Sequence, residues 1–373
     1  MARSNSTSEP WRVGVLFSQT GVTSVIEESQ LRGTLLAIEE VNETGGINGR
    51  ELAPVIYDPA SETRKFARFA NRLLTEDGVN TIFGCYTSSS RKAVLPIVEW
   101  RNGLLWYPTL YEGFEYSPNI IYTGAAPNQN SVALATYLMR NFGPRFFLVG
   151  SDYVYPRESN RILRQLLKQH RGIVVAERYL DLRAGPGDFK VVMRDIRQAK
   201  PDVIFSTVVG EATAHFYRAY ADAGFNPAEM PIASLTTCEA EVRLMGGDVA
   251  RGHITAAPYF ENVATPGNDS FVAKYKQRFG SDQPTNMCAE AAYFQVHIFA
   301  KALAETNTMD TNILRPMVLG CEFEAPQGRI VIDSESNHTD LWTRIGRVGE
   351  RGRFDILMES QLAVRPDPYL VSH

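Results

Sequence analysis

Clusters of hydroxyl-bearing and tyrosine side chains follow nearly every short apolar run of this chain, whereas Lys and Arg are largely absent from the same places. Serine and threonine hydroxyls can hydrogen-bond a carbonyl oxygen or an NH2 group, and a tyrosine ring can cover a short apolar tail. A single cluster is more typical of a helix N-cap, but several at equivalent positions favour a binding site for a small, mostly neutral ligand. The clusters are Ser18–Thr20, Tyr86–Ser90, Tyr107–Thr109, Ser151–Tyr155, Ser206–Thr207, Ser234–Thr237 and Tyr259–Phe260.

Catalytic and metal-binding patterns are weaker than this binding pattern. Cys85 follows an apolar run, but no histidine lies near it in the sequence to generate a thiolate, so we expect a buried, inert cysteine. The chain has no Gly-x-Ser-x-Gly elbow, and its cysteines and histidines show no metal-ligand spacing. We therefore expect no catalytic residue, no metal and no cofactor, and hence a protein that is not an enzyme.

The elements that must position these clusters alternate along the chain. Short apolar runs alternate with amphipathic stretches of helical length, which predicts βαβ units and a parallel sheet. Because ligands bind beyond the carboxyl ends of parallel strands, the clusters stand where a site is expected. The predicted strands are Arg12–Phe17, Leu52–Tyr57, Thr81–Gly84, Leu104–Trp106, Ile120–Tyr122, Arg145–Val149, Ile173–Tyr179, Val203–Phe205, Ile232–Ala233 and His253–Ala257. The predicted helices are Leu31–Thr44, Phe66–Leu74, Arg91–Arg101, Ser131–Phe142, Glu158–His170, Lys190–Ala199, Ala212–Ala223, Ser270–Phe279 and Ala289–Glu305.

The strand–helix alternation restarts once and is then interrupted. It restarts at Arg145 after the Pro- and Asn-containing connection Gly124–Asn130, which marks a first domain boundary. Turn residues at Pro258–Pro266 mark a second change. The tail from Gly328 onward reads as short alternating strands, namely Arg329–Ile332, Thr343–Val348 and Phe354–Met358.

Composition and charge narrow the classes of protein. The chain has 373 residues, 44% of them hydrophobic, and a formal net charge of −4, which argues against direct nucleic-acid binding. Its apolar runs are too short for a membrane span, so we expect no membrane insertion. The amino terminus lacks the apolar core of a secretory signal, which predicts a cytoplasmic protein, or a periplasmic one if an export signal has been removed.

The residues at the predicted strand ends resemble those of the AmiC-type cytoplasmic amide sensors, which have the type I periplasmic-binding-protein fold. The likeness covers residues 12–373. It is carried by Leu16–Ser18 with Thr20–Thr23, Gly84–Tyr86, Arg91–Val94, Tyr107–Thr109, Tyr111–Asn119, Ala126–Ser131, Gly150–Tyr153, Tyr155–Asn160, Phe205–Gly210, Ala233–Thr237, Ala325–Gly328 and Arg365–Tyr369.

Over the same span the chain is similar to the UrtA-type urea receptors of ABC transporters. Phe147–Asp152 looks like the urea-receptor pattern, and so does the acidic Glu211, because amide sensors have a neutral residue there. The stretch Ser206–Val209 is more similar to the amide-sensor pattern than to the urea-receptor pattern. Leu110 and Cys238 depart from the amide-sensor pattern, which has Pro and Ser at these places, so the size and polarity of the pocket stay open.

The resemblance implies an α/β fold of two Rossmann-like lobes, each a doubly wound parallel sheet, joined by a hinge of three chain crossings. The N-terminal lobe would comprise residues 12–122 plus 258–337, and the C-terminal lobe residues 123–257 plus 338–373. A ligand would lie between the lobes. The ligand-binding residues carried over by position are Tyr86, Ser88, Tyr107 and Thr109 on the first lobe and Tyr153, Tyr155, Thr207, Glu211 and Thr237 on the second.

The implied function is non-catalytic sensing of short aliphatic amides or urea. Such sensors typically silence an RNA-binding antiterminator, so the expected partner is an antiterminator protein that controls an amidase-type operon. One alternative is the substrate-binding component of an ABC transporter for urea or short-chain amides, whose partner is a permease. An amide-hydrolysing enzyme is the alternative of another class. Homo-oligomerisation stays open.

Overall fold

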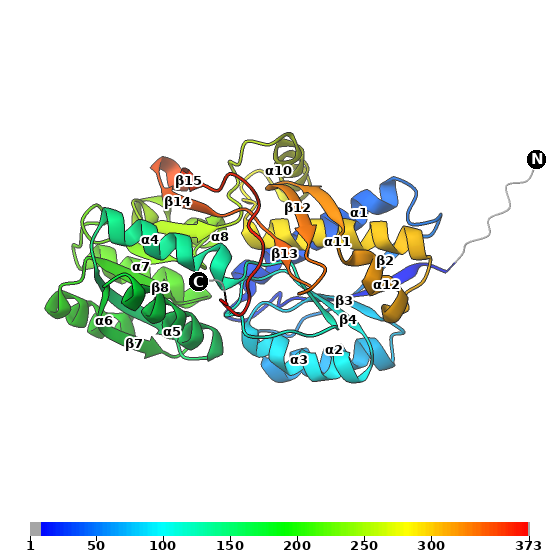
Figure 1. The fold of residues 1–373 in the computed structure, drawn as a ribbon, viewed down its shortest axis with the longest axis horizontal. Coiled ribbons are helices and arrows are strands. Elements are labelled where there is room, and N and C mark those ends of the chain that lie inside the picture. The colour runs from blue at the N-terminus through cyan, green and yellow to red at the C-terminus, as the bar shows by residue number, and fades with distance from the viewer. Residues whose placement is uncertain (1–8, 372–373) are drawn as a thin grey trace, which may run out of the picture.

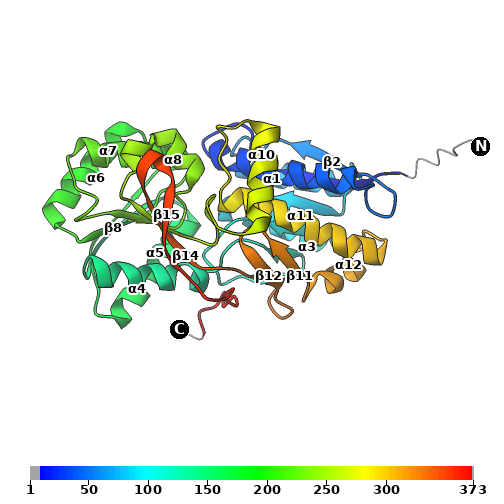
Figure 2. The same cartoon turned by 90° about the horizontal axis from the view of Figure 1, so that it is seen from above.

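Two largely parallel β-sheets lie at the centres of two lobes, which stand side by side in the computed structural model (Figures 1 and 2). The structure describes residues 9–371. Residues 1–8, on which the expectation about an export signal largely rests, lie outside the described residues, as do residues 372–373 at the end of the predicted C-terminal lobe. The predicted α/β fold class, with two lobes built on parallel sheets, is confirmed.

The first sheet is formed by residues 11–122. Its elements are β1 (Trp11–Leu16), α1 (Ser24–Glu43), β2 (Leu52–Tyr57), α2 (Thr63–Thr75), β3 (Thr81–Gly84), α3 (Ser88–Trp100), β4 (Leu104–Tyr107) and β5 (Ile120–Tyr122). The strand order is β2-β1-β3-β4-β5, and all neighbours run parallel. All residues of β3, β4 and β5 are buried, as expected for strands covered by helices on both faces. The order switches sides between β1 and β3, which opens a crevice at their carboxyl ends.

The second sheet repeats this plan. Its elements are α4 (Ser131–Asn141), β6 (Arg145–Ser151), α5 (Val154–Gln169), β7 (Ile173–Leu180), α6 (Pro186–Ala199), β8 (Val203–Thr207), α7 (Glu211–Asp222), β9 (Ile232–Ser234), α8 (Glu239–Met245), α9 (Gly247–Ala250), β10 (Ile254–Ala257), β14 (Arg344–Val348) and β15 (Phe354–Glu359). The order β7-β6-β8-β9-β10 is parallel and matches that of the first sheet, while β14 and β15 add antiparallel strands at its edge. The crevice of this lobe therefore lies at the carboxyl ends of β6 and β8.

Three chain connections join the two sheets. After β5 the chain passes through the short helix η1 (Pro127–Gln129) to the second sheet, and after β10 it returns. The returning part forms α10 (Pro266–Phe279), α11 (Met287–Thr306), α12 (Thr311–Val318) and a small antiparallel sheet of β11 (Glu322–Ala325), β12 (Gly328–Ile332) and β13 (Thr339–Asp340). Helix α11 packs along α1, beside the first sheet (Figure 2). The chain then crosses again to β14, and the lobe boundaries at 122/123, 257/258 and 337/338 stay predictions.

The predicted strands agree with the structure to within two residues at each end, whereas helix starts differ more. Helix α1 begins at Ser24 instead of Leu31, and α5 at Val154 instead of Glu158, because their first turns lack the apolar period. The short elements α8, α9, α12, β11 and β13 were not predicted from the sequence. Among residues 9–371, none of the helices combines the length and hydropathy that a membrane span requires.

Candidate functional site

The carboxyl ends of strands from both sheets enclose a small cavity between the lobes. Its free volume is about 10 Å³, which is about the space needed by one water molecule. The lobes are thus closed around it. The lining residues are Tyr86 and Ser88 after β3, Thr109 and Leu110 after β4, Tyr153 and Tyr155 after β6, Val209 after β8 and Thr236 after β9.

Five of the nine residues predicted from the sequence line this cavity, and both lobes contribute to the five. They are Tyr86, Ser88, Thr109, Tyr153 and Tyr155. Each follows a strand whose carboxyl end faces the opposite lobe, because both sheets have the same doubly wound order. The structure therefore brings these side chains together, and their contact with a ligand stays a proposal.

The other four predicted residues lie outside the cavity. The Tyr107 hydroxyl donates a hydrogen bond to the carbonyl oxygen of Tyr86 at 2.7 Å. The Thr207 hydroxyl donates to the Val149 carbonyl oxygen at 3.3 Å, inside the second lobe. The two remaining residues are Thr237, whose hydroxyl hydrogen-bonds that of Tyr217 at 3.0 Å, and Glu211, which is exposed at the start of α7. Tyr107, Thr207 and Thr237 thus hydrogen-bond within the surrounding structure, whereas the Glu211 side chain faces solvent.

Three lining residues were not predicted as ligand contacts, and the sequence signals for them are weak. Thr236 belongs to the cluster Ser234–Thr237, but the sequence does not tell which of two adjacent threonines faces the ligand. Leu110 and Val209 are apolar; the sequence analysis noted Leu110 only as a departure that affects the size and polarity of the pocket, and Val209 carries no chemical signature. Apolar lining residues of this kind can only be placed once the strand ends are placed in space.

Tyrosine hydroxyls provide hydrogen-bond donors at the cavity. The Tyr155 hydroxyl oxygen is buried and makes no hydrogen bond of normal geometry among residues 9–371, although the Ser159 side chain is a polar neighbour. Burial raises the pKa of the Tyr86 and Tyr155 hydroxyls well above the ordinary value, so both stay protonated. A buried hydroxyl without a partner is unfavourable unless a ligand group completes it. The Tyr155 hydroxyl is therefore available to a hydrogen-bond acceptor on a ligand.

The hydroxyl proton of Ser88 is already committed. Ser88 Oγ is hydrogen-bonded to the carboxylate of Glu112, and Arg91 Nη1 donates to the same Oγ at 3.2 Å. Glu112 also forms an ion pair with Arg91 at 3.1 Å. Because a carboxylate has no proton to give, Ser88 must donate to Glu112. What Ser88 offers to the cavity is therefore a lone pair, which accepts an N–H or O–H.

Arg91 anchors a buried ionic network behind Ser88. Its side chain is fully buried and forms an ion pair with Glu115 at 2.7 Å, while Lys92 Nζ lies 2.8 Å from the same carboxylate. Although burial acts to raise the pKa of Glu115, Arg91 and Lys92 lower it to about 2. The two cations and the two carboxylates balance, so the network fixes Ser88 without adding net charge. The sequence analysis did not predict this network, although Arg91–Val94 and Tyr111–Asn119 are among the stretches that carry the family resemblance.

No charged side chain among residues 9–371 lines the cavity itself. The sequence offers three acids that could face a ligand ammonium group, and the structure places all of them elsewhere. Glu211 is exposed, and Asp152 forms an ion pair with Arg157 at 2.7 Å on the surface. Glu239 lines a different pocket. A charged ligand would therefore enter a cavity without a direct counter-charge.

The cysteine thiols and the groups of side chains that could bind a metal ion were also considered. Cys85 is buried, and burial raises the pKa of its thiol, so it is not a thiolate at neutral pH. All four cysteines are free. Within the part of the chain that the structure describes, no group of three or more His, Cys, Asp or Glu side chains is placed to hold a metal ion.

Comparisons with known proteins agree with the two-lobed architecture. Residues 11–373 match the model of a family described as periplasmic binding protein domain. The leucine-, isoleucine-, valine-, threonine- and alanine-binding protein of Pseudomonas aeruginosa is 24% identical over 322 residues, which covers 85% of this chain and 84% of that protein. A Leu/Ile/Val-binding protein homolog of Brucella melitensis is 23% identical over 303 residues, covering 79% of this chain and 77% of its own length.

Solved structures of transporter components share the fold. The solute-binding protein of an ABC transporter from Rhodopseudomonas palustris, in complex with p-hydroxybenzoic acid, has a TM-score of 0.88 and 20% identity, and covers 98% of this chain and 100% of that one. A branched-chain amino acid transporter substrate-binding protein from Streptococcus pneumoniae, in complex with isoleucine, has a TM-score of 0.83 and 18% identity, with 96% and 100% coverage. At this level of identity the likeness shows the fold.

Proposed function

The chain belongs to the periplasmic binding protein family, and from this premise we propose that it is the substrate-binding component of an ABC transporter for urea or a short-chain amide. The single observation that carries the choice of ligand is the cavity between the lobes. It is very small, lined by hydroxyls and apolar groups, and without a charged side chain among the described residues. Such a site suits a small neutral ligand with both donor and acceptor groups.

The hydrogen-bonding groups of the cavity complement an amide. Ser88 presents a lone pair because its proton goes to Glu112, so it can accept an N–H of the ligand NH2 group. The Tyr155 hydroxyl is protonated and makes no hydrogen bond of normal geometry among the described residues, so it can donate to the ligand carbonyl oxygen. Leu110 and Val209 provide apolar side chains against which a short alkyl tail can pack. Urea and acetamide carry both kinds of polar group.

Amino acids fit this cavity less well, although relatives of the chain are named for binding them. A zwitterionic amino acid brings a carboxylate and an ammonium group, and burying either without an opposite charge or a full set of hydrogen bonds is costly. Ser88 cannot donate a second hydrogen bond to a carboxylate while it donates to Glu112. The nearest charges, Arg91 and Glu112, are already paired with each other.

The expected partner on this proposal is a permease, and the working location is the periplasm. One solved relative is described as a solute-binding protein of an ABC transporter and another as a transporter substrate-binding protein, which favours transport over the regulatory interpretation. The expected amide sensor, with its antiterminator partner in the cytoplasm, rests on the resemblance of the sequence alone. A strain lacking this chain should lose growth on low concentrations of urea or acetamide as the nitrogen source. Normal uptake together with lost amidase induction would support the regulator instead.

Calorimetric titration tests the ligand class directly. We expect measurable binding of urea, acetamide or butyramide and none of acetate, which has the shape of acetamide but offers a carboxylate in place of the amide. Leucine and isoleucine complete the series. Tight binding of an amino acid with no response to any amide would overturn the proposal.

Ligand binding without turnover is the second expectation. The hydrolytic alternative requires a nucleophile, and Cys85, the nucleophile considered from the sequence, is buried as a protonated thiol. Incubation of the pure protein with acetamide or urea should release no more ammonia than a heat-denatured control. Release above that control would show an enzyme.

A further inference from the structure

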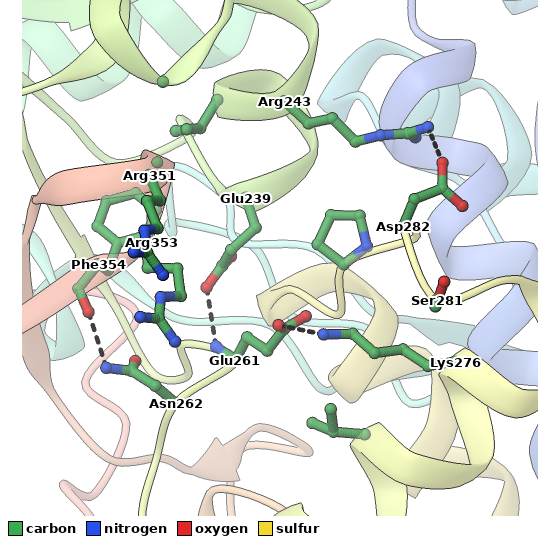
Figure 3. Close-up of a pocket in the computed structure, with 15 residues that line it drawn as sticks. Glu239, Arg243, Glu261, Asn262, Lys276, Ser281, Asp282, Arg351, Arg353 and Phe354 are labelled. Carbon is green, nitrogen blue, oxygen red and sulfur yellow. Dashed lines mark hydrogen bonds and ion pairs between the residues drawn. The ribbon is translucent and has the colours of Figure 1, made fainter.

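A second and larger pocket lies where the chain crosses between the lobes after β10 (Figure 3). It has a volume of about 580 Å³, within the range of small-molecule sites. Helix α8 and the turn η2 (Glu350–Gly352) before β15 form its walls on the second lobe. Helix α10 and the loop that follows it form the wall beside the first sheet, and Glu261 and Asn262 of the crossing segment lie between them.

Polar contacts hold these walls in place. Arg243 of α8 forms an ion pair with Asp282 of the loop after α10, at 2.5 Å. Asn262 Nδ2 donates to the carbonyl oxygen of Phe354 at 2.7 Å. Lys276 Nζ lies 2.6 Å from the carboxylate of Glu261. The pocket is thus built from both lobes and the crossing segment. In the ion pairs Arg243–Asp282 and Lys276–Glu261, both partners belong to the lining of the pocket.

Two arginines at the pocket have no such partner. Arg351 and Arg353 are both exposed, and neither forms an ion pair or a side-chain hydrogen bond with any of residues 9–371. Figure 3 shows their side chains at the wall that carries Phe354, on the same side as Glu239. Two unpaired guanidinium groups make this wall electropositive, and guanidinium groups bind carboxylates with paired hydrogen bonds.

Glu239 adds an unsatisfied polar atom to the same wall. Its side chain is only 7% exposed. One carboxyl oxygen, Oε1, accepts a hydrogen bond from the backbone N–H of Glu261 at 2.8 Å, whereas Oε2 is buried with no partner among residues 9–371. Burial raises the pKa of Glu239 to about 8, so the carboxyl is mostly protonated at neutral pH and can donate a hydrogen bond. Because Oε2 has no contact with solvent, it faces away from the open pocket, and Glu239 helps to form the wall without contacting a ligand.

Apolar groups complete the pocket. They are Val242 on α8, Val272 on α10, Pro284 in the loop and Phe354 at the start of β15. Aliphatic and aromatic side chains facing one another across a pocket suit the flat or short apolar body of a small molecule. A small inorganic anion has no apolar part that could cover these apolar side chains.

We propose that this pocket is a second ligand site, separate from the amide cavity, and that it binds a small organic anion consisting of a carboxylate on an apolar body. The carboxylate meets Arg351 and Arg353, while the apolar body lies against Phe354 and Val242. This inference does not depend on which ligand occupies the cavity between the strand ends.

Occupation of this pocket stabilises the closed arrangement, because its walls come from both lobes. A ligand shifts a conformational equilibrium only by its different affinities for the two states, and the complete set of walls exists when the lobes are closed. The anion therefore raises the affinity of the cavity for its own ligand, and the cavity ligand raises the affinity for the anion by the same factor.

The test uses benzoate and benzamide as a matched pair of probes, since they differ in charge and have nearly the same shape. We expect calorimetry to show that the intact protein binds benzoate at least about tenfold more tightly than benzamide. The double variant Arg351→Ala/Arg353→Ala should lose at least about tenfold in benzoate affinity. The control Arg183→Ala/Arg347→Ala removes the same charge from exposed arginines outside the pocket and should bind as the wild type does. Both variants replace exposed side chains, and their melting curves should match that of the wild type.

Three results would overturn the site: no benzoate binding at millimolar concentration, equal binding of benzoate and benzamide, or equal losses in both double variants. Ser88→Ala should retain benzoate binding, and its loss there would place benzoate in the amide cavity instead. Repeating the acetamide titration at saturating benzoate tests the coupling between the two sites. If benzoate binds but the acetamide affinity does not change, the two sites are not coupled. That result would overturn the inference that the anion stabilises the closed lobes.

Discussion

The backbone N–H of Glu211 donates a hydrogen bond to the carbonyl oxygen of Val22 at 3.0 Å. This bond joins the first turn of α7, on the second lobe, to the loop after β1, on the first. Gly210 just before it has a φ of +69°, and a Cβ atom at this position would lie 2.5 Å from the same carbonyl oxygen. The closed lobes thus meet backbone to backbone, and Glu211 contributes its main chain to closure while its side chain points to solvent.

A methyl group at Gly210 should therefore oppose closure. We expect Gly210→Ala to weaken ligand binding by about tenfold or more, because the Cβ atom collides with Val22 before the lobes close. Small-angle scattering with saturating ligand should show a larger radius of gyration than the wild type. Gly224→Ala is the matched control, since Gly224 has a similar φ of +71° but nothing within 4 Å of its added Cβ. Equal losses of affinity in both variants would point to backbone strain, not to closure.

The direction of the Ser88 hydrogen bond should determine whether the cavity prefers an amide or a carboxylate ligand. Ser88→Ala removes the acceptor for the ligand NH2 group and should cost about 1–3 kcal/mol of binding free energy. Glu112→Gln presents an amide that can donate to Ser88, which frees the serine proton for the ligand. We expect this variant to lose preference for acetamide over acetate, as measured by calorimetry of both.

The control for Glu112 is its neighbour in the same network. Glu115 binds Arg91 and Lys92 but does not contact Ser88. Glu115→Gln should weaken the buried network and lower the melting temperature, yet keep the preference for acetamide. If both glutamate variants change the preference equally, the effect comes from the network as a whole and the role assigned to the serine proton is wrong.

Tyr155 should separate stability from binding. Its buried hydroxyl makes no hydrogen bond of normal geometry among the described residues and has only the Ser159 side chain as a recorded polar neighbour, so Tyr155→Phe should leave the melting temperature of the ligand-free protein nearly unchanged or higher. The same change should weaken urea or acetamide binding, because the donor to the ligand carbonyl is lost. Tyr107→Phe is expected to do the opposite: it loses the bond to the Tyr86 carbonyl and about 1 kcal/mol of stability. Undiminished amide binding by Tyr155→Phe would exclude this tyrosine as a ligand contact.

The sequence predicted the sheets well because buried parallel strands are short, continuous apolar runs such as Thr81–Gly84. It predicted helix starts poorly, since the first turn of α3, Ser88–Ser90, is polar and does not continue an apolar stripe; Ser88 lines the cavity, and Thr87 caps the helix through the Ser90 N–H. Among site residues, hydroxyls that follow strands were found. Thr207 and Thr237 look identical to cavity residues in the sequence, and only their bonds inside the second lobe distinguish them. Pairings between distant segments, such as Ser88 with Glu112, leave no local signature.

Buried glutamates should make the protein less stable as the pH rises above neutrality. Burial raises the pKa of Glu239, Glu241 and Glu290 to about 8 each, and that of Glu27 to about 7. In the unfolded chain these groups ionise near their ordinary value of about 4.3. Between that value and the folded pKa, the folded state holds more protons than the unfolded state. Their contribution to stability is therefore complete below pH 4 and is lost as the pH rises through 7 to 8.

The window from pH 6.5 to 8 isolates this effect. Burial lowers the pKa of His253 to about 3 and that of His338 to about 4, so these histidines destabilise the fold only when the unfolded chain binds protons, at and below about pH 6.5. Above that pH the glutamates dominate, and each lowers the free energy of unfolding by up to about 1.4 kcal/mol per pH unit. Heat denaturation is the proper measurement, because urea is a candidate ligand, and the melting temperature should fall across the window. Glu290→Gln removes one of the titrating groups and should flatten the fall. A melting temperature that stays constant or rises between pH 6.5 and 8 would show that these carboxyls are already ionised in the folded protein.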